Sequence, residues 1–271
     1  MNSNHWCFIL GGSSGFGLAA AKIFADKGYN LFLVHRDRKM RLTELDIEFE
    51  LIRKKGVQLI SVNCNINDKN NEPLIVKKLK DSLVADGKIK VFLHSVADGN
   101  IGYLVENENI PHQKSLFCKN LTEDSFAYTI QSMGTSFISW SKLLAENNFL
   151  TNKSRIIGLT SEGTSKVLTN YAAVAAAKSV LESACKYLAV ELAPLGITTN
   201  LINAGITDTN ALKIFPGYND MIDFAKKRNP MGRMTTPEDV AKVIYLLSTD
   251  DADWINGTII RVDGGEQIVG F

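Results

Sequence analysis

The chain has 271 residues, of which 45% are hydrophobic and 22% charged, and its 30 basic and 29 acidic residues give a formal net charge of +1 at pH 7. This composition is ordinary for a globular protein and supplies enough apolar side chains for a large core. It excludes a general nucleic-acid binder, which needs a basic excess or a basic stripe. No run approaches about 18 uninterrupted apolar residues, so no membrane span is predicted.

Short apolar runs alternate with helical stretches along the whole chain. In chain order we predict a strand at 6–10, a helix at 18–27, a strand at 31–34, a helix at 43–55, a strand at 57–62, a helix at 73–85, a strand at 90–96, a helix at 125–147, a strand at 155–160, a helix at 170–193, a strand at 197–202, a helix at 237–247 and a strand at 258–262. Such alternation is typical of βαβ units. We therefore predict an α/β fold, a Rossmann-type doubly wound parallel sheet of about seven strands with helices on both faces, in one domain over residues 1–271.

Two polar segments interrupt this alternation. Residues 98–124 form a long loop after the fourth predicted strand, and residues 207–233 form a partly helical lid after the sixth. Ligands of open parallel sheets bind outside the carboxyl ends of the strands, so we expect both segments at the binding site. We predict substrate contacts from Gly99, Leu212 and Phe215, with plain packing as the alternative for the two apolar side chains.

The cysteines indicate a reducing compartment. Cys7, Cys64, Cys118 and Cys185 are widely spaced and form no Cys-x-x-Cys pair. We expect free thiols and neither a disulfide framework nor a metal site. The first residues show no positive segment followed by a long apolar stretch, so we expect no secretory signal and a cytoplasmic protein.

A glycine-rich segment follows the first predicted strand and opens the first predicted helix. Its glycines permit a tight turn in which backbone N–H groups approach a phosphate, and the helix dipole favours that anion. The strand–turn–helix context favours a dinucleotide site over a mere turn. The candidate cofactor contacts in this segment are Gly11, Ser13, Ser14, Gly15, Phe16 and Gly17.

The end of the second predicted strand separates NADPH from NADH. An acidic residue there binds the ribose 2′-hydroxyl and repels a 2′-phosphate. The sequence has Arg36, whose planar guanidinium can pair with a 2′-phosphate, and Asp37 comes late for a ribose acid. NADPH is therefore favoured over NADH, and a solvated turn is the alternative for Arg36 and Arg38.

The G-x-x-x-G-x-G spacing and the Val-Asp-Gly-Gly at 262–265 resemble the short-chain dehydrogenase/reductase family along essentially the whole chain. Most members carry a tyrosine four residues before a lysine, whereas Tyr171 precedes Lys178 by seven. Positions seven apart lie about two turns apart on one helix face. With His94-Ser95 at the end of the fourth strand, and Met133 where mainstream members carry a catalytic asparagine, this Tyr-x6-Lys pattern resembles the NADPH-dependent enoyl-acyl-carrier-protein reductases of fatty-acid biosynthesis.

The resemblance implies a role for each candidate residue. Tyr171 would hydrogen-bond the thioester oxygen of a trans-2-enoyl thioester that is reduced by NADPH, and Lys178 would hold the nicotinamide ribose. Ser161 would either hydrogen-bond the substrate carbonyl or merely cap the end of its strand. The further cofactor contacts implied are Asn65, Ile66, Ser95, Val96, Thr207 and Thr209.

Two other functions stay open at this point. One is a carbonyl reductase or alcohol dehydrogenase of the same family in secondary metabolism, which the shifted tyrosine and the missing asparagine disfavour. The other is a non-catalytic nucleotide-binding regulatory protein, which the presence of both Tyr171 and Lys178 disfavours.

The resemblance also implies partners. It implies a homotetramer built on the helices at 125–147 and 170–193, where we interpret Tyr187 as a packing residue. An acidic acyl carrier protein is a candidate partner that Lys226-Lys227-Arg228 would attract, unless this run is simply a solvated helix face.

Overall fold

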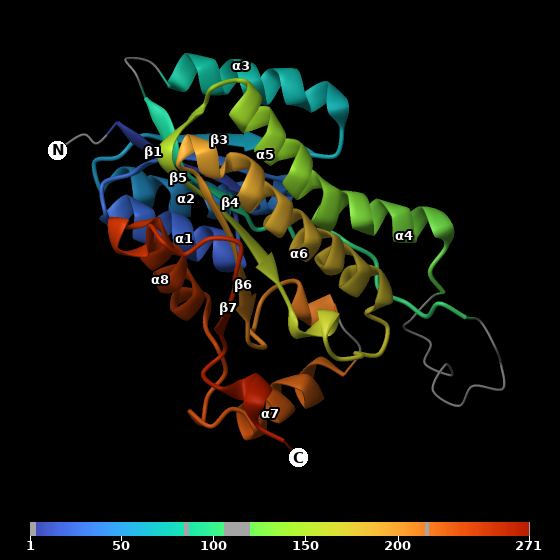
Figure 1. Cartoon of the computed structure of the whole chain (residues 1–271). Coiled ribbons are helices and arrows are strands. Elements are labelled where there is room, and N and C mark those ends of the chain that lie inside the picture. Colours follow the sequence, from blue (N-terminus) through green and yellow to red (C-terminus); the bar gives the residue numbers. More distant parts are fainter. Residues whose placement is uncertain (1–3, 84–86, 106–119, 215–216, 271) are drawn as a thin grey trace.

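The computed structural model describes residues 4–83, 87–105, 120–214 and 217–270. Within these residues, seven parallel strands form one sheet in the order β3-β2-β1-β4-β5-β6-β7 (Figure 1). The strands are β1 His5–Leu10, β2 Asn30–His35, β3 Leu59–Asn63, β4 Lys88–His94, β5 Leu150–Thr160, β6 Thr198–Ala204 and β7 Ile259–Val262. The predicted fold class is confirmed.

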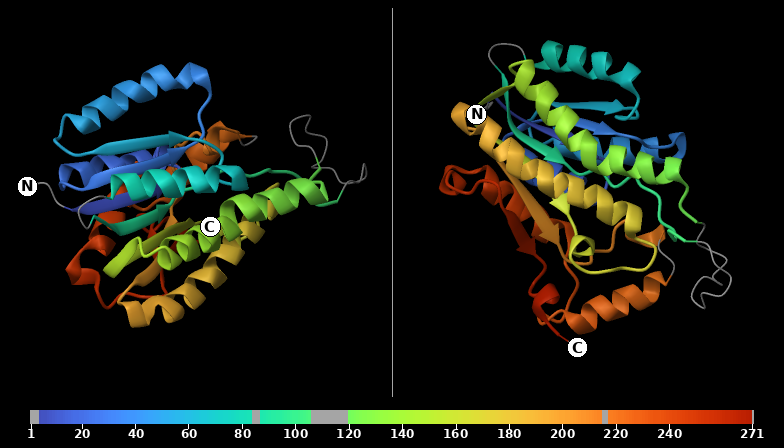
Figure 2. Two further views of the ribbon diagram at one scale, coloured as in Figure 1. Left: turned by 90° about the horizontal axis from the view of Figure 1, so that it is seen from above. Right: turned by 45° about the vertical axis from the view of Figure 1, so that its right-hand side comes forward.

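Helices cover both faces of the sheet (Figure 2). One face carries α3 (Glu72–Ser82), α5 (Ser136–Glu146) and α6 (Ala172–Leu192), and the other carries α1 (Gly15–Asp26), α2 (Lys39–Arg53) and α8 (Pro237–Ser248). Helix α4 (Glu123–Ile130) runs on beyond the sheet in line with α5, and α7 (Tyr218–Arg228) lies near the C-terminus (Figure 1).

The two faces explain why the strands are continuous apolar runs. In β1, Phe8 and Leu10 belong to the core under α3, α5 and α6, whereas Cys7 and Ile9 belong to the core under α1, α2 and α8. Successive side chains of a strand point to opposite faces, and a parallel sheet covered on both faces buries all of them. All four side chains are fully buried.

The topology places a binding crevice at the carboxyl end of β1. The chain passes from β1 outward to β2 and β3, and then crosses back to place β4 on the other side of β1. The connections after β1 and β4 therefore leave the sheet in opposite directions, which opens a crevice between them. The glycine-rich segment and Ser95 follow these two strands.

The predicted helix at 125–147 is interrupted. Helix α4 ends at Ile130, a π-helical turn spans Gln131–Thr135, and α5 begins at Ser136. Such turns insert one residue into a helix and occur often at functional sites. Hydrophobic periodicity does not reveal an inserted residue, so the sequence predicted one continuous helix.

Two further predictions need comment. Tyr187 is 69% exposed, so its interpretation as a packing residue is wrong within this chain. Cys118, Phe215 and residues 106–119 of the predicted long loop lie outside the described residues, whereas Cys7, Cys64 and Cys185 are free thiols. In the part of the chain that the structure describes, no helix has the length and apolar character to cross a membrane.

Candidate active site

The glycine-rich turn is built so that side chains are excluded from it. Gly11 has a φ of +85°, and a Cβ there would lie 2.3 Å from the carbonyl oxygen of Ser95. A Cβ on Gly17 would lie 2.1 Å from the carbonyl oxygen of Gly11. The first glycine therefore lets the turn lie against the end of β4, and the last lets α1 lie against the turn.

The N-terminus of α1 fits a dinucleotide pyrophosphate. Its N-cap residue Ser14 makes no side-chain hydrogen bond to the first turn, so the first N–H groups of α1 receive no cap from Ser14. Such N–H groups and the helix dipole bind anions. Thr209 faces Gly15 across the crevice, since a Cβ on Gly15 would lie 3.5 Å from the Thr209 methyl group. Ser13 is buried in the turn, and Phe16 is half-buried.

Arg36 reaches across the crevice from the end of β2. Its Nη2 donates to Asp98 Oδ1 at 2.8 Å and its Nη1 donates to Tyr128 Oη at 3.1 Å. Tyr128 Oη in turn donates to Asp98 Oδ2 at 2.5 Å. A guanidinium has five N–H donors, so these contacts leave donors for a 2′-phosphate.

Asp37 is committed to a structural role. Its carboxylate lies 2.9 Å from His35 Nδ1 and 2.6 Å from Arg41 Nη1, and its side chain is only 3% exposed. This buried carboxylate is therefore not free to bind a ribose hydroxyl, as the sequence indicated.

The remaining adenine-side candidates follow β3 and β4. Asn65 Oδ1 accepts from the Asn67 N–H at 3.0 Å, which shapes the turn after β3. Ile66 and Val96 are half-buried and pack against the core cluster beneath α3, α5 and α6. Ser95 N–H donates to the Leu10 carbonyl at 2.8 Å, which extends the β1–β4 pairing to the crevice.

Tyr171 and Ser161 meet at the carboxyl end of β5. Tyr171 Oη donates to Ser161 Oγ at 3.1 Å. Tyr171 is the N-cap of α6, so it lies one residue before the helix begins at Ala172. The residue before it, Asn170, has a φ of +66°. Asparagine tolerates this left-handed conformation better than most residues. Burial raises the pKa of the Tyr171 phenol, and the Ser161 hydrogen bond lowers it.

The Tyr171 ring packs in a small apolar cluster. It packs against the buried Met133, Val174 and Ala177, and Ile101 and Ile130 pack against the same three residues. Met133 belongs to the π-helical turn, so this turn presents a thioether, not a carboxamide, toward the tyrosine.

Lys178 is buried at the same edge of the sheet. Its residue is 6% exposed, and burial lowers the pKa of its ammonium to about 8, whereas the charge of Glu182 acts to raise it. Glu182 accepts from Thr160 Oγ1 at 2.5 Å, at the end of β5. Burial and the Lys178 charge lower the pKa of His94, at the end of β4, to about 3, so this imidazole is neutral.

Tyr171 and Lys178 both lie toward the carboxyl ends of the central strands. The phenol contacts Ser161, which directly follows β5. The ammonium lies near His94, the last residue of β4, and near Glu182 of α6, which accepts a hydrogen bond from Thr160 at the end of β5. The shared face across two turns stays a prediction, because Tyr171 itself precedes the helix.

The structure places three further candidates in the segments that follow β6 and β4. Thr207 is buried, and its hydroxyl donates to the Gly205 carbonyl at 2.9 Å. Leu212 is half-buried in a short 3-10 turn after Thr209. Gly99 lies against α4 and the π-helical turn, because a Cβ there would lie 2.6 Å from Thr129 and 2.9 Å from Met133.

Sequence reasoning missed three residues next to the site. Glu162 and Arg228 form a buried ion pair with N–O distances of 2.5 and 2.8 Å, so the interpretation of Arg228 as part of a solvated basic run is wrong. Gly163 lies under Tyr171, since a Cβ there would lie 2.5 Å from the ring. A lone glycine or a distant charge pair leaves no periodic signal. Among the described residues, no group of His, Cys, Asp and Glu has metal-site geometry.

The site places a glycine-rich turn that fits a dinucleotide beside a tyrosine, a serine and a buried lysine. Together these features define one class of protein. The family model described as enoyl-(acyl carrier protein) reductase matches residues 11–267. An uncharacterized oxidoreductase of Bacillus subtilis, YjdA, is 29% identical over 95% of this chain and 94% of its own length. The chain therefore belongs to the enoyl-acyl-carrier-protein-reductase-like short-chain dehydrogenases/reductases, a family of NAD(P)H-dependent oxidoreductases.

Other relatives span more than one activity. The NADH-dependent enoyl-acyl-carrier-protein reductase FabI of Synechocystis is 32% identical over 68% of this chain and 67% of its own length. Carbonyl reductase family member 4 of Xenopus laevis is 26% identical over 97% and 98% of the two chains. The solved structure of the NADH-dependent enoyl reductase of Aquifex aeolicus aligns with a TM-score of 0.81 at 23% identity, covering 100% of this chain and 99% of its own, which shows the shared fold.

Proposed function

We propose that this protein reduces the carbon–carbon double bond of a trans-2-enoyl thioester with NADPH. The observation that carries the proposal is the Tyr171–Ser161 hydrogen bond, with the buried Lys178 seven residues after the tyrosine. A bound nicotinamide dinucleotide supplies the hydride, which goes to the β-carbon of the substrate. Tyr171 then donates a hydrogen bond to the thioester oxygen while negative charge builds there, a kind of stabilisation that often supplies the largest catalytic contribution.

Lys178 and Ser161 support that hydrogen bond. The buried Lys178 ammonium would hold the ribose hydroxyls of a bound nicotinamide dinucleotide, and its positive charge would then favour a polarised Tyr171 phenol. Ser161 accepts from Tyr171 and so keeps the phenol directed into the crevice. The α-carbon of the resulting enolate then takes a proton from solvent water, which gives the saturated thioester.

Replacing the phenol tests the proposal directly. We expect Tyr171→Phe to lower kcat for crotonyl and longer enoyl thioesters by about 100-fold or more, since it removes the donor to the developing oxyanion. Initial rates of NADPH oxidation measure this loss, with Tyr187→Phe as the control because Tyr187 is an exposed tyrosine of the same helix. A Tyr171→Phe enzyme that keeps the wild-type rate would refute the assigned role.

NADPH is the proposed cofactor because Arg36 lies at the end of β2. We expect Arg36→Ala to weaken NADPH binding by about tenfold or more, the equivalent of one charge-assisted hydrogen bond. NADH binding should change by less than about threefold, because NADH has no 2′-phosphate for the guanidinium to hold. Equilibrium titrations of cofactor fluorescence measure both affinities, and equal losses for the two cofactors would contradict the assignment.

A carbonyl reductase is the second candidate function. The serine at 161 favours it, because its hydroxyl contacts the tyrosine as a partner in ketone reduction would. Ketone and enoyl thioester substrates assayed side by side with the same cofactor separate the two activities.

We further propose a homotetramer, an acyl carrier protein partner and a cytoplasmic location. The exposed Ile138 of α5 and the exposed Val190 of α6 support an assembly through these helices, which light scattering tests. The exposed Lys226 and Lys227 support attraction of an acidic carrier protein. The free thiols of Cys7, Cys64 and Cys185 support a reducing compartment.

A further inference from the structure

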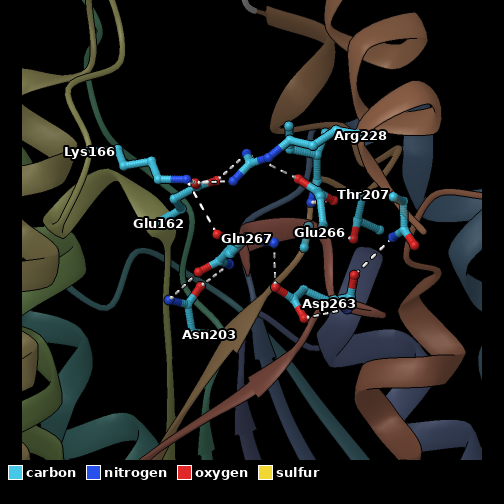
Figure 3. Close-up of polar contacts among 12 residues, drawn as sticks. Glu162, Lys166, Asn203, Thr207, Arg228, Asp263, Glu266 and Gln267 are labelled. Carbon is cyan, nitrogen blue, oxygen red and sulfur yellow. Dashed lines mark hydrogen bonds and ion pairs between the residues drawn. The ribbon is translucent and has the colours of Figure 1, made fainter. Parts of the chain in front are cut away.

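Arg228 lies at the centre of a buried cluster of charges beside the active site. Its guanidinium donates from Nη1 to Glu162 Oε2 at 2.8 Å and from Nη2 to Glu162 Oε1 at 2.5 Å (Figure 3). Glu266 Oε1 lies 3.8 Å from Arg228 Nη1, and Lys166 Nζ contacts Glu162 from the outside. The side chains of Glu162, Arg228 and Glu266 are 10%, 6% and 0% exposed. We refer to these four residues as the Arg228 cluster.

The Arg228 cluster joins three parts of the chain that border the crevice. Arg228 is the last residue of α7, Glu162 begins the turn after β5, and Glu266 belongs to the turn that follows β7. Glu266 Oε2 also accepts from the Ile206 N–H at 3.1 Å, at the start of the segment after β6. The Asn203 and Gln267 amides pair reciprocally at 3.2 and 2.9 Å, which fixes this turn to the end of β6 (Figure 3).

The turn held by Arg228 is the one that supports the reacting groups. It spans Glu162–Thr164 and directly follows Ser161. Its Gly163 touches the Tyr171 ring so closely that no side chain fits, and the same missing Cβ would lie 3.4 Å from Ser161 Oγ. A shift of Glu162 therefore moves Ser161 and the surface on which the Tyr171 ring rests.

We propose that Glu162 and Arg228 are positioning residues: their two parallel hydrogen bonds hold the 162–164 turn so that the Ser161 hydroxyl stays aligned with the Tyr171 phenol. This inference rests on the proposed function for its catalytic consequence. A planar guanidinium binds both oxygens of one carboxylate in a fixed geometry, which a lysine ammonium cannot reproduce. Glu162 takes the two terminal nitrogens of this guanidinium, while Glu266 lies at the longer distance of 3.8 Å from Nη1.

The test reads the Tyr171 phenol directly. The tyrosines are labelled with ¹³C at Cζ, and the Tyr171 resonance is assigned by its absence from the spectrum of Tyr171→Phe. The change in its chemical shift in Ser161→Ala then measures the loss of the Ser161 hydrogen bond. We expect Glu162→Gln and Arg228→Lys to shift the same resonance by at least half as much in the wild-type background. Neither change should shift it further in the Ser161→Ala background, because the pair acts through Ser161.

The same single and double variants are also compared by their kinetics. We expect Glu162→Gln and Arg228→Lys each to lower kcat about tenfold with Ser161 present and less than twofold in Ser161→Ala, with the Kd for NADPH unchanged. The control is Arg53→Gln, because Arg53 also pairs with a carboxylate, that of Glu50 at 2.6 Å, but lies at the end of α2 and does not contact the 162–164 turn. It should leave both the resonance and kcat unchanged.

The outcomes separate this inference from the proposed function. A Tyr171 resonance that is unmoved in a folded Glu162→Gln or Arg228→Lys protein, or equal losses of kcat in both Ser161 backgrounds, overturns the positioning role. A resonance that responds as expected, in a protein that reduces no enoyl thioester, supports the positioning role and refutes the proposed reaction. Glu162→Gln keeps one amide oxygen for Arg228, so it serves as the second variant if Arg228→Lys does not fold.

Discussion

Among the individual residues of this site, Lys178 is a buried cation. Lys178 is an ammonium on an amphipathic helix, yet its side chain points inward and is buried near the neutral His94. Burial lowers the pKa of Lys178 to about 8, because a low-dielectric surrounding disfavours the charged form. The folded protein therefore tolerates this charge for its chemistry, at a cost to its own stability.

That cost gives a pH-dependent prediction. Between about pH 8 and 10.5 the unfolded chain binds more protons at this lysine than the folded chain, so wild-type stability rises with pH across that window. We expect Lys178→Met to be more stable than wild type at pH 7 by up to about 3 kcal/mol, and the difference to shrink as pH rises from 8 to 10.5.

Urea unfolding of the cofactor-free proteins at pH 7 and pH 10 measures this difference. The matched control is Lys186→Met, since Lys186 is an exposed lysine of the same helix. A Lys178→Met protein whose stability advantage is the same at both pH values would show that the lysine is not destabilised by its burial. Cofactor titrations of the same protein test the ribose assignment, because loss of the ammonium should weaken binding.

At this scale the sequence predicted the residues whose spacing carries information. Tyr171 and Lys178 were singled out because seven residues make two helical turns. In the structure Tyr171 contacts Ser161 at the end of β5, and Lys178 lies near His94 at the end of β4. Glu162 and Arg228 were not found, because a pair 66 positions apart in the chain leaves no local pattern. Burial of Arg228 within a run of three basic residues depends on that distant partner, so the run alone indicated a solvated face.

At the scale of elements, the strand–turn–helix unit at the start of the chain depends on backbone contacts. Gly17 lies in the first turn of α1, and its Cα faces the Gly11 carbonyl of the preceding turn. We expect Gly17→Ala to weaken cofactor binding roughly 100-fold, about 2.7 kcal/mol, because the added methyl group would force α1 away from the phosphate-binding turn.

The control for this prediction lies in the same turn. The atom nearest to a Cβ on Gly12 would be the Leu33 Cβ at 3.0 Å, which needs a displacement of only a few tenths of an ångström, whereas the 2.1 Å contact of Gly17 needs a shift of the backbone. Titration of NADPH fluorescence should therefore find Gly12→Ala much closer to wild type than Gly17→Ala. Similar affinities for the two variants would contradict the proposed clash with the Gly11 carbonyl.

The ends of a helix were predicted correctly where local residues such as proline set them. They were missed where packing between helices sets them. Pro237 begins α8 as predicted, with a capping box between Thr236 and Asp239. The π-helical turn at Gln131–Thr135 was missed, because its cause is tertiary: Gly134 lies so close to α6 that a Cβ would be 2.7 Å from the Ala177 carbonyl. The approach of one helix to another is not written in the periodicity of either.

At the scale of the whole molecule, the two edges of the sheet carry different tasks. The carboxyl edge holds the crevice, the Tyr171–Ser161 pair and the Arg228 cluster. Arg155 of β5 is instead in register with Thr198, the first residue of β6, which places it toward the amino edge. Its side chain is 2% exposed and forms an ion pair with Asp253, which follows α8. This pair ties the middle of the sheet to the end of the α8 segment.

Stability and catalysis should therefore be separable by substitution at the amino edge. Asp253→Asn leaves the buried Arg155 charge without its carboxylate, and loss of one partner of a buried pair is strongly destabilising. Since the Asp253 carboxylate is itself 38% exposed, solvent screens part of the pair, and we expect the loss of stability to lower the Tm by a few degrees. Thermal unfolding measures the loss, and kcat and KM at 25 °C should stay within about twofold of wild type because no crevice residue moves.

Asp250→Asn is the control: its carboxylate is 72% exposed and pairs with Lys153 at 3.3 Å, so its Tm should change little. A fall in kcat in Asp253→Asn at a temperature where the protein is folded would show instead that the two edges are coupled through β5.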